Sequence, residues 1–185
     1  MKIALLAPAG AMHRYNGMFH KGLHYAPITL ALLAALVPED LNAEVKIYDE
    51  TAEAIPLDLD ADIIGITCIT GTSSRCYNFA DYFRSKGKTV ILGGVHPSLM
   101  PEEAKQHADS IILGLGEINF PKALRDFKNG CLQPVYHQDP CTDISVIVTS
   151  TDVVSPLRSL GFLTLFVITN GLWWFKYLFQ RMFLG

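Results

Sequence analysis

Three short segments rich in glycine and in polar side chains could together form a ligand site. They span residues 70–73, 93–97 and 114–117, and each follows a mostly apolar run. Glycines let a bulky ligand approach the backbone, and hydroxyl groups offer adaptable hydrogen bonds. A single segment of this kind would indicate no more than a tight turn, but three that converge on one sheet edge predict a binding site. The candidate binding residues are Thr70, Gly71, Thr72, Ser73, Gly93, Gly94, Val95, His96, Pro97, Gly114, Gly116 and Glu117.

Two of these candidates have side chains that leave alternatives open. His96 precedes a proline that stiffens its loop, and it either contacts the ligand or hydrogen-bonds to the loop backbone. Glu117 either accepts a hydrogen bond from the ligand or caps the next helix through its free amides. A Cβ at Gly93 or Gly94 would collide with whatever lies on the sheet edge, or would demand a backbone angle that favours glycine. No catalytic residue and no metal ligand is predicted.

The elements that position these segments alternate along the chain. Continuous apolar runs at 2–7, 62–69, 89–92 and 110–113 are typical of strands buried on both faces, whereas residues 44–49 alternate like an edge strand. Helical patterns follow Pro27, begin near Thr72, open at Pro101 and continue through residues 120–127. We therefore expect a doubly wound, flavodoxin-like α/β domain over residues 1–130, with a five-stranded parallel sheet in the order 2-1-3-4-5 and helices on both faces.

Several common functions of this fold are disfavoured. The first strand is not followed by GxGxxG, no GxxxxGK[ST] occurs, and the acids of a phosphoacceptor receiver are missing. The net charge is −3 without a basic stripe, so nucleic-acid binding is not indicated. None of the four cysteines forms a CxxC pair, which indicates neither a zinc site nor a redox motif. We interpret the domain as cytoplasmic, with reduced thiols.

Residues 61–70, 90–97 and 114–117 together resemble a known domain. They are similar to the cobalamin-binding domain at the N-terminus of cobalamin-dependent radical S-adenosylmethionine enzymes. The resemblance covers residues 1–130 and implies that cobalamin is the cofactor, bound by the loops at the carboxyl ends of the strands. It also implies that an intact relative uses cobalamin in methyl transfer or in another radical reaction, with an iron–sulfur cluster and S-adenosylmethionine.

Two departures from related cobalamin proteins limit this resemblance. In methionine synthase and the mutases the first strand is followed by DxHxxG, whose histidine ligates cobalt; here His13 is present, but Ala11 replaces the aspartate and Gly17 lies one residue too far. The resemblance to the radical enzymes then implies cobalamin binding without a protein histidine. The CxxxCxxC motif for the iron–sulfur cluster is absent, so the chain alone would be a carrier rather than a catalyst, with a separate catalytic domain as its partner.

The C-terminal part of the chain follows a different pattern. Residues 131–156 are expected to form a linker, with residues 144–148 as one additional strand. Residues 157–185 form an apolar tail, in which seventeen uncharged residues separate Arg158 from Lys176. The tail fits membrane association, packing on a missing partner domain, or non-native sequence after a truncation. The alternatives to a cobalamin domain are therefore a flavodoxin-like module for a small molecule or nucleotide with a membrane-associated tail, or an inert truncated fragment.

Overall fold

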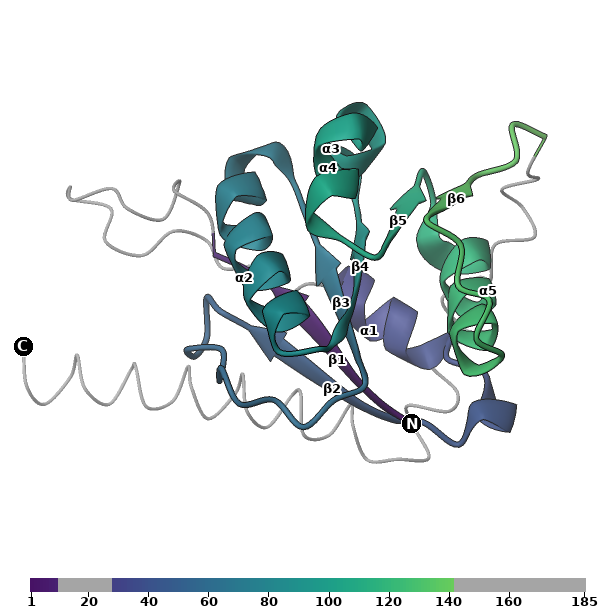
Figure 1. Ribbon diagram of the computed structural model, residues 1–185, viewed down its shortest axis with the longest axis horizontal. Helices are drawn as coiled ribbons and strands as arrows, with labels where there is room; N and C mark the ends of the chain where they lie inside the picture. The colour runs from purple at the N-terminus through teal and green to yellow at the C-terminus, as the bar shows by residue number, and fades with distance from the viewer. Residues whose placement is uncertain (10–27, 142–185) are drawn as a thin grey trace, which may run out of the picture. The chain divides into compact units, whose positions relative to one another are not determined.

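A six-stranded parallel sheet forms the centre of the domain (Figure 1). The computed structural model describes residues 1–9 and 28–141. The strand order is β2-β1-β3-β4-β5-β6, which contains the predicted order 2-1-3-4-5. The strands are β1 (Lys2–Ala7), β2 (Glu44–Asp49), β3 (Ile63–Thr67), β4 (Thr89–Gly93), β5 (Ser110–Leu113) and β6 (Val135–His137).

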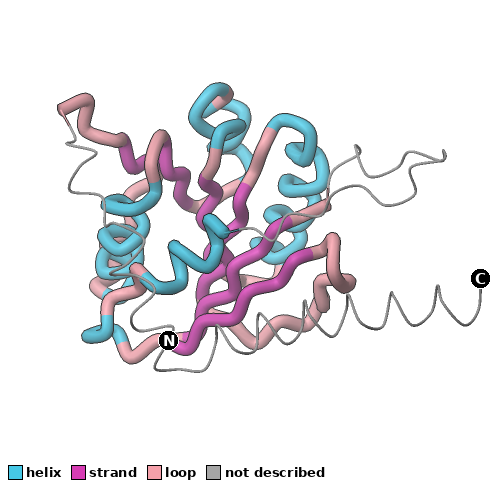
Figure 2. Tube along the Cα trace, turned by 180° about the vertical axis from the view of Figure 1, so that it is seen from behind, coloured by secondary structure: helices cyan, strands magenta, loops and turns pink. Residues whose placement is uncertain are grey.

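Helices cover both faces of the sheet (Figure 2). The helices are α1 (Ile28–Ala35), α2 (Ser73–Ser85), α3 (Val95–Leu99), α4 (Pro101–His107) and α5 (Gly116–Lys128), with 3-10 turns η2 (Glu39–Leu41) and η3 (Thr70–Thr72). Successive strand residues point to opposite faces. In β1, Ile3 and Leu5 pack in the core under α1 and α5, whereas Ala4 and Leu6 pack in the core under α2 and α4. The doubly wound, flavodoxin-like class is thereby confirmed.

The predicted number of five strands is wrong, because the described part of the chain contributes a sixth. Strand β6 pairs with β5 and lies within the segment that was expected to be a linker. It has only three residues, too few for an alternating pattern to stand out in the sequence. Its anchor is Tyr136, which is buried and whose hydroxyl donates to Asp126 at 2.7 Å and accepts from the amide of Gln133 at 3.0 Å.

Helix α3 is a second element that the sequence does not reveal. A proline at its third position argues against a helix, but the first turn tolerates proline because its amides have no intrahelical partner. No helix of the described residues is long and apolar enough to cross a membrane. The predicted strand at 144–148 and the apolar tail lie outside the described residues.

Candidate functional site

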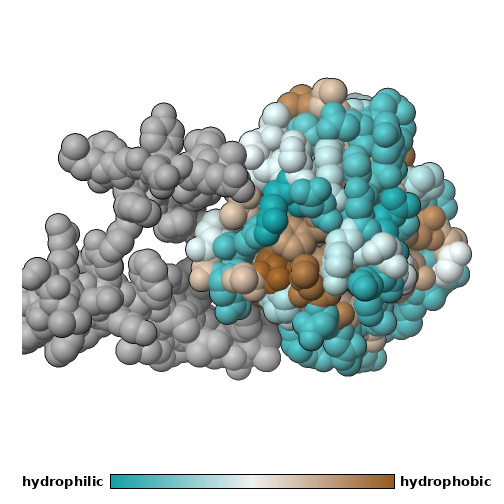
Figure 3. Space-filling view, turned by 60° about the vertical axis from the view of Figure 1, so that its left-hand side comes forward, coloured by the Kyte–Doolittle hydropathy of each residue, from teal (hydrophilic) through white to brown (hydrophobic). Residues whose placement is uncertain are grey.

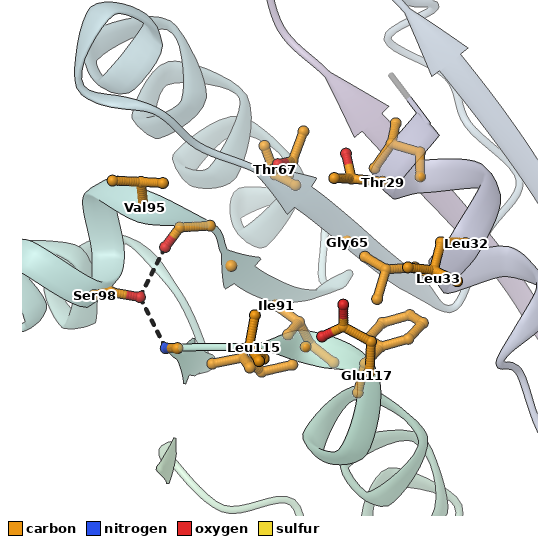
Figure 4. A pocket seen from close by; sticks show the side chains of 18 of the residues that line it. Thr29, Leu32, Leu33, Gly65, Thr67, Ile91, Val95, Ser98, Leu115 and Glu117 are labelled. Carbon is orange, nitrogen blue, oxygen red and sulfur yellow. Dashed lines mark hydrogen bonds between the residues drawn. The ribbon is translucent and has the colours of Figure 1, made fainter. Parts of the chain in front are cut away.

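A pocket of about 470 Å³ opens at the carboxyl edge of the sheet, on the face covered by α1 and α5 (Figure 4). Its floor is formed by side chains that extend from the strands, among them Leu5, Ile91 and Ile112. Leu33 of α1 and Phe120 of α5 form its walls. The pocket is largely apolar, and pockets of this size and character are typical of cofactor sites.

Two glycines of the central strands, Gly65 and Gly93, line the pocket. A Cβ added to Gly65 in β3 would lie 2.8 Å from Cδ2 of Leu5 and 3.8 Å from Cε2 of Phe120, so glycine at this position lets the Leu5 side chain pack against β3. A Cβ added to Gly93 would meet nothing closer than the Cβ of Ile112 at 3.9 Å. Because Gly93 lines the pocket, a side chain there would extend into its open volume. Gly93 thus leaves space at the end of β4 for a bulky ligand.

Half of the predicted binding residues line this pocket. They are Gly93, Gly94, Val95, Gly114, Gly116 and Glu117. They follow β4 and β5, whose carboxyl ends lie at the same edge of the parallel sheet, as the sequence analysis expected. Two of the glycines have backbone angles that side chains rarely adopt, with φ of +108° at Gly94 and +80° at Gly114.

The other six predicted residues do not line the pocket. Thr70, Gly71, Thr72, Ser73, His96 and Pro97 belong to η3, the start of α2 and the buried side of α3. The Thr72 hydroxyl donates to the carbonyl of Ile69 at 3.1 Å, and the Ser73 hydroxyl donates to the carbonyl of Thr70 at 3.1 Å. Both hydroxyls therefore stabilise the turn that leads into α2. Gly71 is exposed, with open space around its Cα.

His96 is buried, with an exposed fraction of 5%. Its Nδ1 lies 3.3 Å from the hydroxyl oxygen of Thr70, which connects α3 to η3. Its Nε2 has no hydrogen-bond partner within the described chain and lies 3.7 Å from a carboxylate oxygen of Glu103. The neighbouring Tyr77 is buried as well; burial and the nearby Glu103 carboxylate raise the pKa of its hydroxyl. His96 therefore links α3 to η3 and is not among the residues that line the pocket.

Sequence reasoning missed two polar residues that hold the pocket's mouth in shape. The Ser98 hydroxyl donates to the carbonyl of Gly94 at 2.9 Å and accepts from the amide of Gly114 at 2.9 Å, so it links the loops after β4 and β5 (Figure 4). The amide oxygen of Gln138 accepts from the backbone N–H of Leu115 at 2.8 Å. Ser98 could have been suspected from its place beside the glycines, but Gln138 comes from the segment expected to be a linker.

Exposed apolar side chains surround this edge. Val95 and Leu99 on α3 have exposed fractions of 59% and 67%, and Met100, Leu115 and Ile118 are exposed as well. Figure 3 shows apolar atoms at the top of the molecule, the end at which α3 and α4 lie in Figure 1. Val95, Leu99 and Leu115 also line the pocket, and exposed apolar residues in such a place are typical of a surface that a ligand or a partner covers.

Fold and pocket together define a cofactor-binding α/β domain, and comparison with known proteins gives its family. The B12 binding domain family matches residues 21–124, and the chain belongs to this family. Cobalamin is accordingly its cofactor, as the resemblance of the sequence implied. The glycines at the strand ends and the apolar pocket at the carboxyl edge leave space for part of such a cofactor.

Two curated relatives come from Chlorobaculum tepidum. The chain is 38% identical to bacteriochlorophyllide d C-8(2)-methyltransferase over 109 residues, which are 59% of this chain and 24% of the relative. It is 31% identical to bacteriochlorophyllide d C-12(1)-methyltransferase over 121 residues, 64% of this chain and 26% of the relative. The chain thus spans about a quarter of the length of these relatives. Among solved structures, the N-terminal domain of a hypothetical protein from Thermotoga maritima matches with a TM-score of 0.41 and 19% identity, over 67% of this chain and 99% of that one.

Proposed function

We propose that this chain is the cofactor-binding part of a cobalamin-dependent methyltransferase of the radical S-adenosylmethionine type. In this proposal the corrin ring lies against the carboxyl edge of the sheet, and the nucleotide tail of cobalamin enters the pocket between α1 and α5. Bound cobalamin would supply a cobalt centre that can carry a methyl group. These 185 residues contain no CxxxCxxC, so an iron–sulfur cluster and S-adenosylmethionine would be bound outside them.

The observation that carries the proposal is the combination of a deep apolar pocket with glycines at the strand ends above it. Gly93 leaves room at the mouth, where an added Cβ would meet nothing closer than the Cβ of Ile112 at 3.9 Å. The exposed apolar residues around the mouth, with Leu99 as the most exposed, would be covered by the corrin ring and by whatever packs above it. The names of the two relatives, both methyltransferases, support methyl transfer as the reaction of the complete protein.

The polar groups of the loops have a supporting part in this arrangement. Ser98 and Gln138 already hydrogen-bond to backbone groups, so they hold the mouth open without a ligand. A preformed site loses less conformational entropy when the ligand binds. We therefore expect the loops after β4 and β5 to change little when cobalamin binds.

Titration calorimetry with the full chain and hydroxocobalamin tests the proposal. We expect saturable binding with a stoichiometry of one, together with co-elution of the red chromophore and the protein. Cobinamide, which lacks the nucleotide tail, is the matched control and should bind at least tenfold more weakly. Absence of heat and of co-elution at high micromolar concentration would contradict cobalamin binding, and equal affinity for cobinamide would contradict the placement of the tail.

A further inference from the structure

The pocket contains one ionisable side chain among the described residues that line it, and this is Glu117. It lies in the first turn of α5. No side-chain hydrogen bond caps this helix end, and no hydrogen bond or ion pair of Glu117 occurs within residues 1–9 and 28–141. Figure 4 shows its carboxylate pointing into the pocket.

The surroundings of this carboxylate are apolar. Phe120 follows it by three positions and so lies on the same face of α5, where it lines the pocket. Leu33 of α1 is close to the start of α5, since a Cβ added to Gly116 would lie 3.2 Å from its Cδ2. A carboxylate in such a place loses free energy when a ligand removes its water, unless the ligand offers a hydrogen-bond donor.

The other polar groups of the pocket cannot replace Glu117 in this respect. The Ser98 hydroxyl and the Gln138 amide oxygen are engaged by backbone groups of the neighbouring loops. Thr29 and Thr67 also line the pocket, but their hydroxyls are neutral and can rotate either to donate or to accept. Among the described residues that line the pocket, Glu117 alone combines a negative charge with acceptor-only chemistry.

We propose that Glu117 determines which lower base of a corrinoid the pocket accepts. The carboxylate favours a base that carries an N–H donor, such as the exocyclic amino group of adenine, and disfavours a dimethylbenzimidazole base, which has no donor. The inference rests on the proposed function, in that the nucleotide tail must enter the pocket. It goes beyond that function because it concerns discrimination among corrinoids that differ only in this base.

Calorimetry on the full chain with three ligands tests the inference. The ligands are cobalamin, its analogue with adenine as the lower base, and cobinamide. The measured quantity is the selectivity, which is the Kd for cobalamin divided by the Kd for the adenine analogue. We expect Glu117→Leu to lower this selectivity at least tenfold, and Glu117→Gln, which keeps an acceptor oxygen without the charge, to lower it less. Affinity for cobinamide should stay within twofold of wild type in both variants, and thermal melting verifies that they fold.

Each contrary outcome has a distinct meaning. An unchanged selectivity with both affinities reduced equally would overturn the inference and would place Glu117 at the ribose, which both ligands share. A selectivity that rises in Glu117→Leu would overturn it as well, because the side chain would then favour dimethylbenzimidazole. Failure of all three corrinoids to bind wild type would instead refute the proposed function, and the inference with it.

Discussion

Replacement of Gly94 by alanine should lower the stability of the domain because two structural requirements are violated together. Gly94 has φ of +108° and ψ of −170°, a region that is essentially restricted to glycine. The new Cβ would lie 2.7 Å from the carbonyl oxygen of Cys68 and 3.1 Å from its amide nitrogen. Both are backbone atoms of the residue that follows β3. The carbonyl also accepts from the amide of His96 at 3.1 Å, and the amide donates to the carbonyl of Gly93 at 2.8 Å, so neither can rotate away.

The expected magnitude follows from this geometry. The backbone angle alone costs about 1–3 kcal/mol for a residue with a side chain. In a protein of this size that corresponds to a fall in Tm of about 2–12 °C, and displacement of the Cys68 backbone adds to it. The sequence leaves open whether a Cβ at Gly94 would collide with a neighbouring group or would demand a rare backbone angle, and the structure shows both.

Gly93 provides a matched comparison one residue earlier. A Cβ there has open space, so Gly93→Val should melt close to wild type while its side chain occupies part of the pocket. Its cobalamin affinity should fall at least tenfold, or about 1.4 kcal/mol. Differential scanning calorimetry and titration calorimetry on both variants separate the effects. A Gly94→Ala variant that melts within 1 °C of wild type would refute the backbone argument. A Gly93→Val variant with wild-type affinity for cobalamin would contradict the placement of the nucleotide tail in this pocket.

Four further predictions concern other parts of the chain. His13→Ala should leave the cobalt(II) paramagnetic spectrum of bound cobalamin unchanged, because the DxHxxG motif is broken; a loss of nitrogen hyperfine splitting would contradict this. Tyr136→Phe should cost about 1 kcal/mol in urea unfolding because a buried hydrogen bond is lost. Burial raises the pKa of Tyr136 to about 12 from 10.0, so wild type should lose this advantage over the variant as the pH rises from 10 to 12. The hydrogen bond from Arg75 lowers the pKa of Glu50, so the stability that wild type has over Arg75→Ala should be present above pH 4.5 and should shrink as the pH falls through the lowered pKa. Deletion of residues 151–185 should leave cobalamin affinity intact and raise solubility, and loss of cooperative melting would show that the tail is a packed element.

The strands and their order could be predicted because burial on both faces leaves a plain trace in the sequence. The runs at 2–7, 62–69, 89–92 and 110–113 correspond to β1, β3, β4 and β5, and the alternating residues 44–49 correspond to β2. Strand β6 could not be predicted in this way. Its position depends on pairing with β5, more than twenty residues earlier in the chain, and on the hydrogen bond from Tyr136 to Asp126, and a local pattern contains neither.

Only half of the predicted binding residues line the pocket, because the sequence does not show in which direction each side chain points. Sequence places residues at the carboxyl edge but does not say to which face of the sheet they turn. Thr70 and His96 turn toward α2 and α4, where they contact each other, whereas Glu117 turns toward α1 and into the pocket. Gly65 also lines the pocket but was not predicted to do so, because it lies inside β3 and not in the loop that follows it.

Ser98 and Gln138 at the mouth of the pocket already hydrogen-bond to backbone groups, and this limits how a ligand can gain affinity. Displacement of the Ser98 hydroxyl or of the Gln138 amide by a ligand would leave a backbone group unpaired, at a cost of about 1–3 kcal/mol each. Affinity must therefore come mainly from apolar burial, worth roughly 25 cal/mol per Å², in the space that Gly93 leaves free. Apolar burial distinguishes ligands by shape, but it distinguishes poorly between bases of similar size. A single unpaired carboxylate at Glu117 is then the feature of the described pocket best suited to such discrimination.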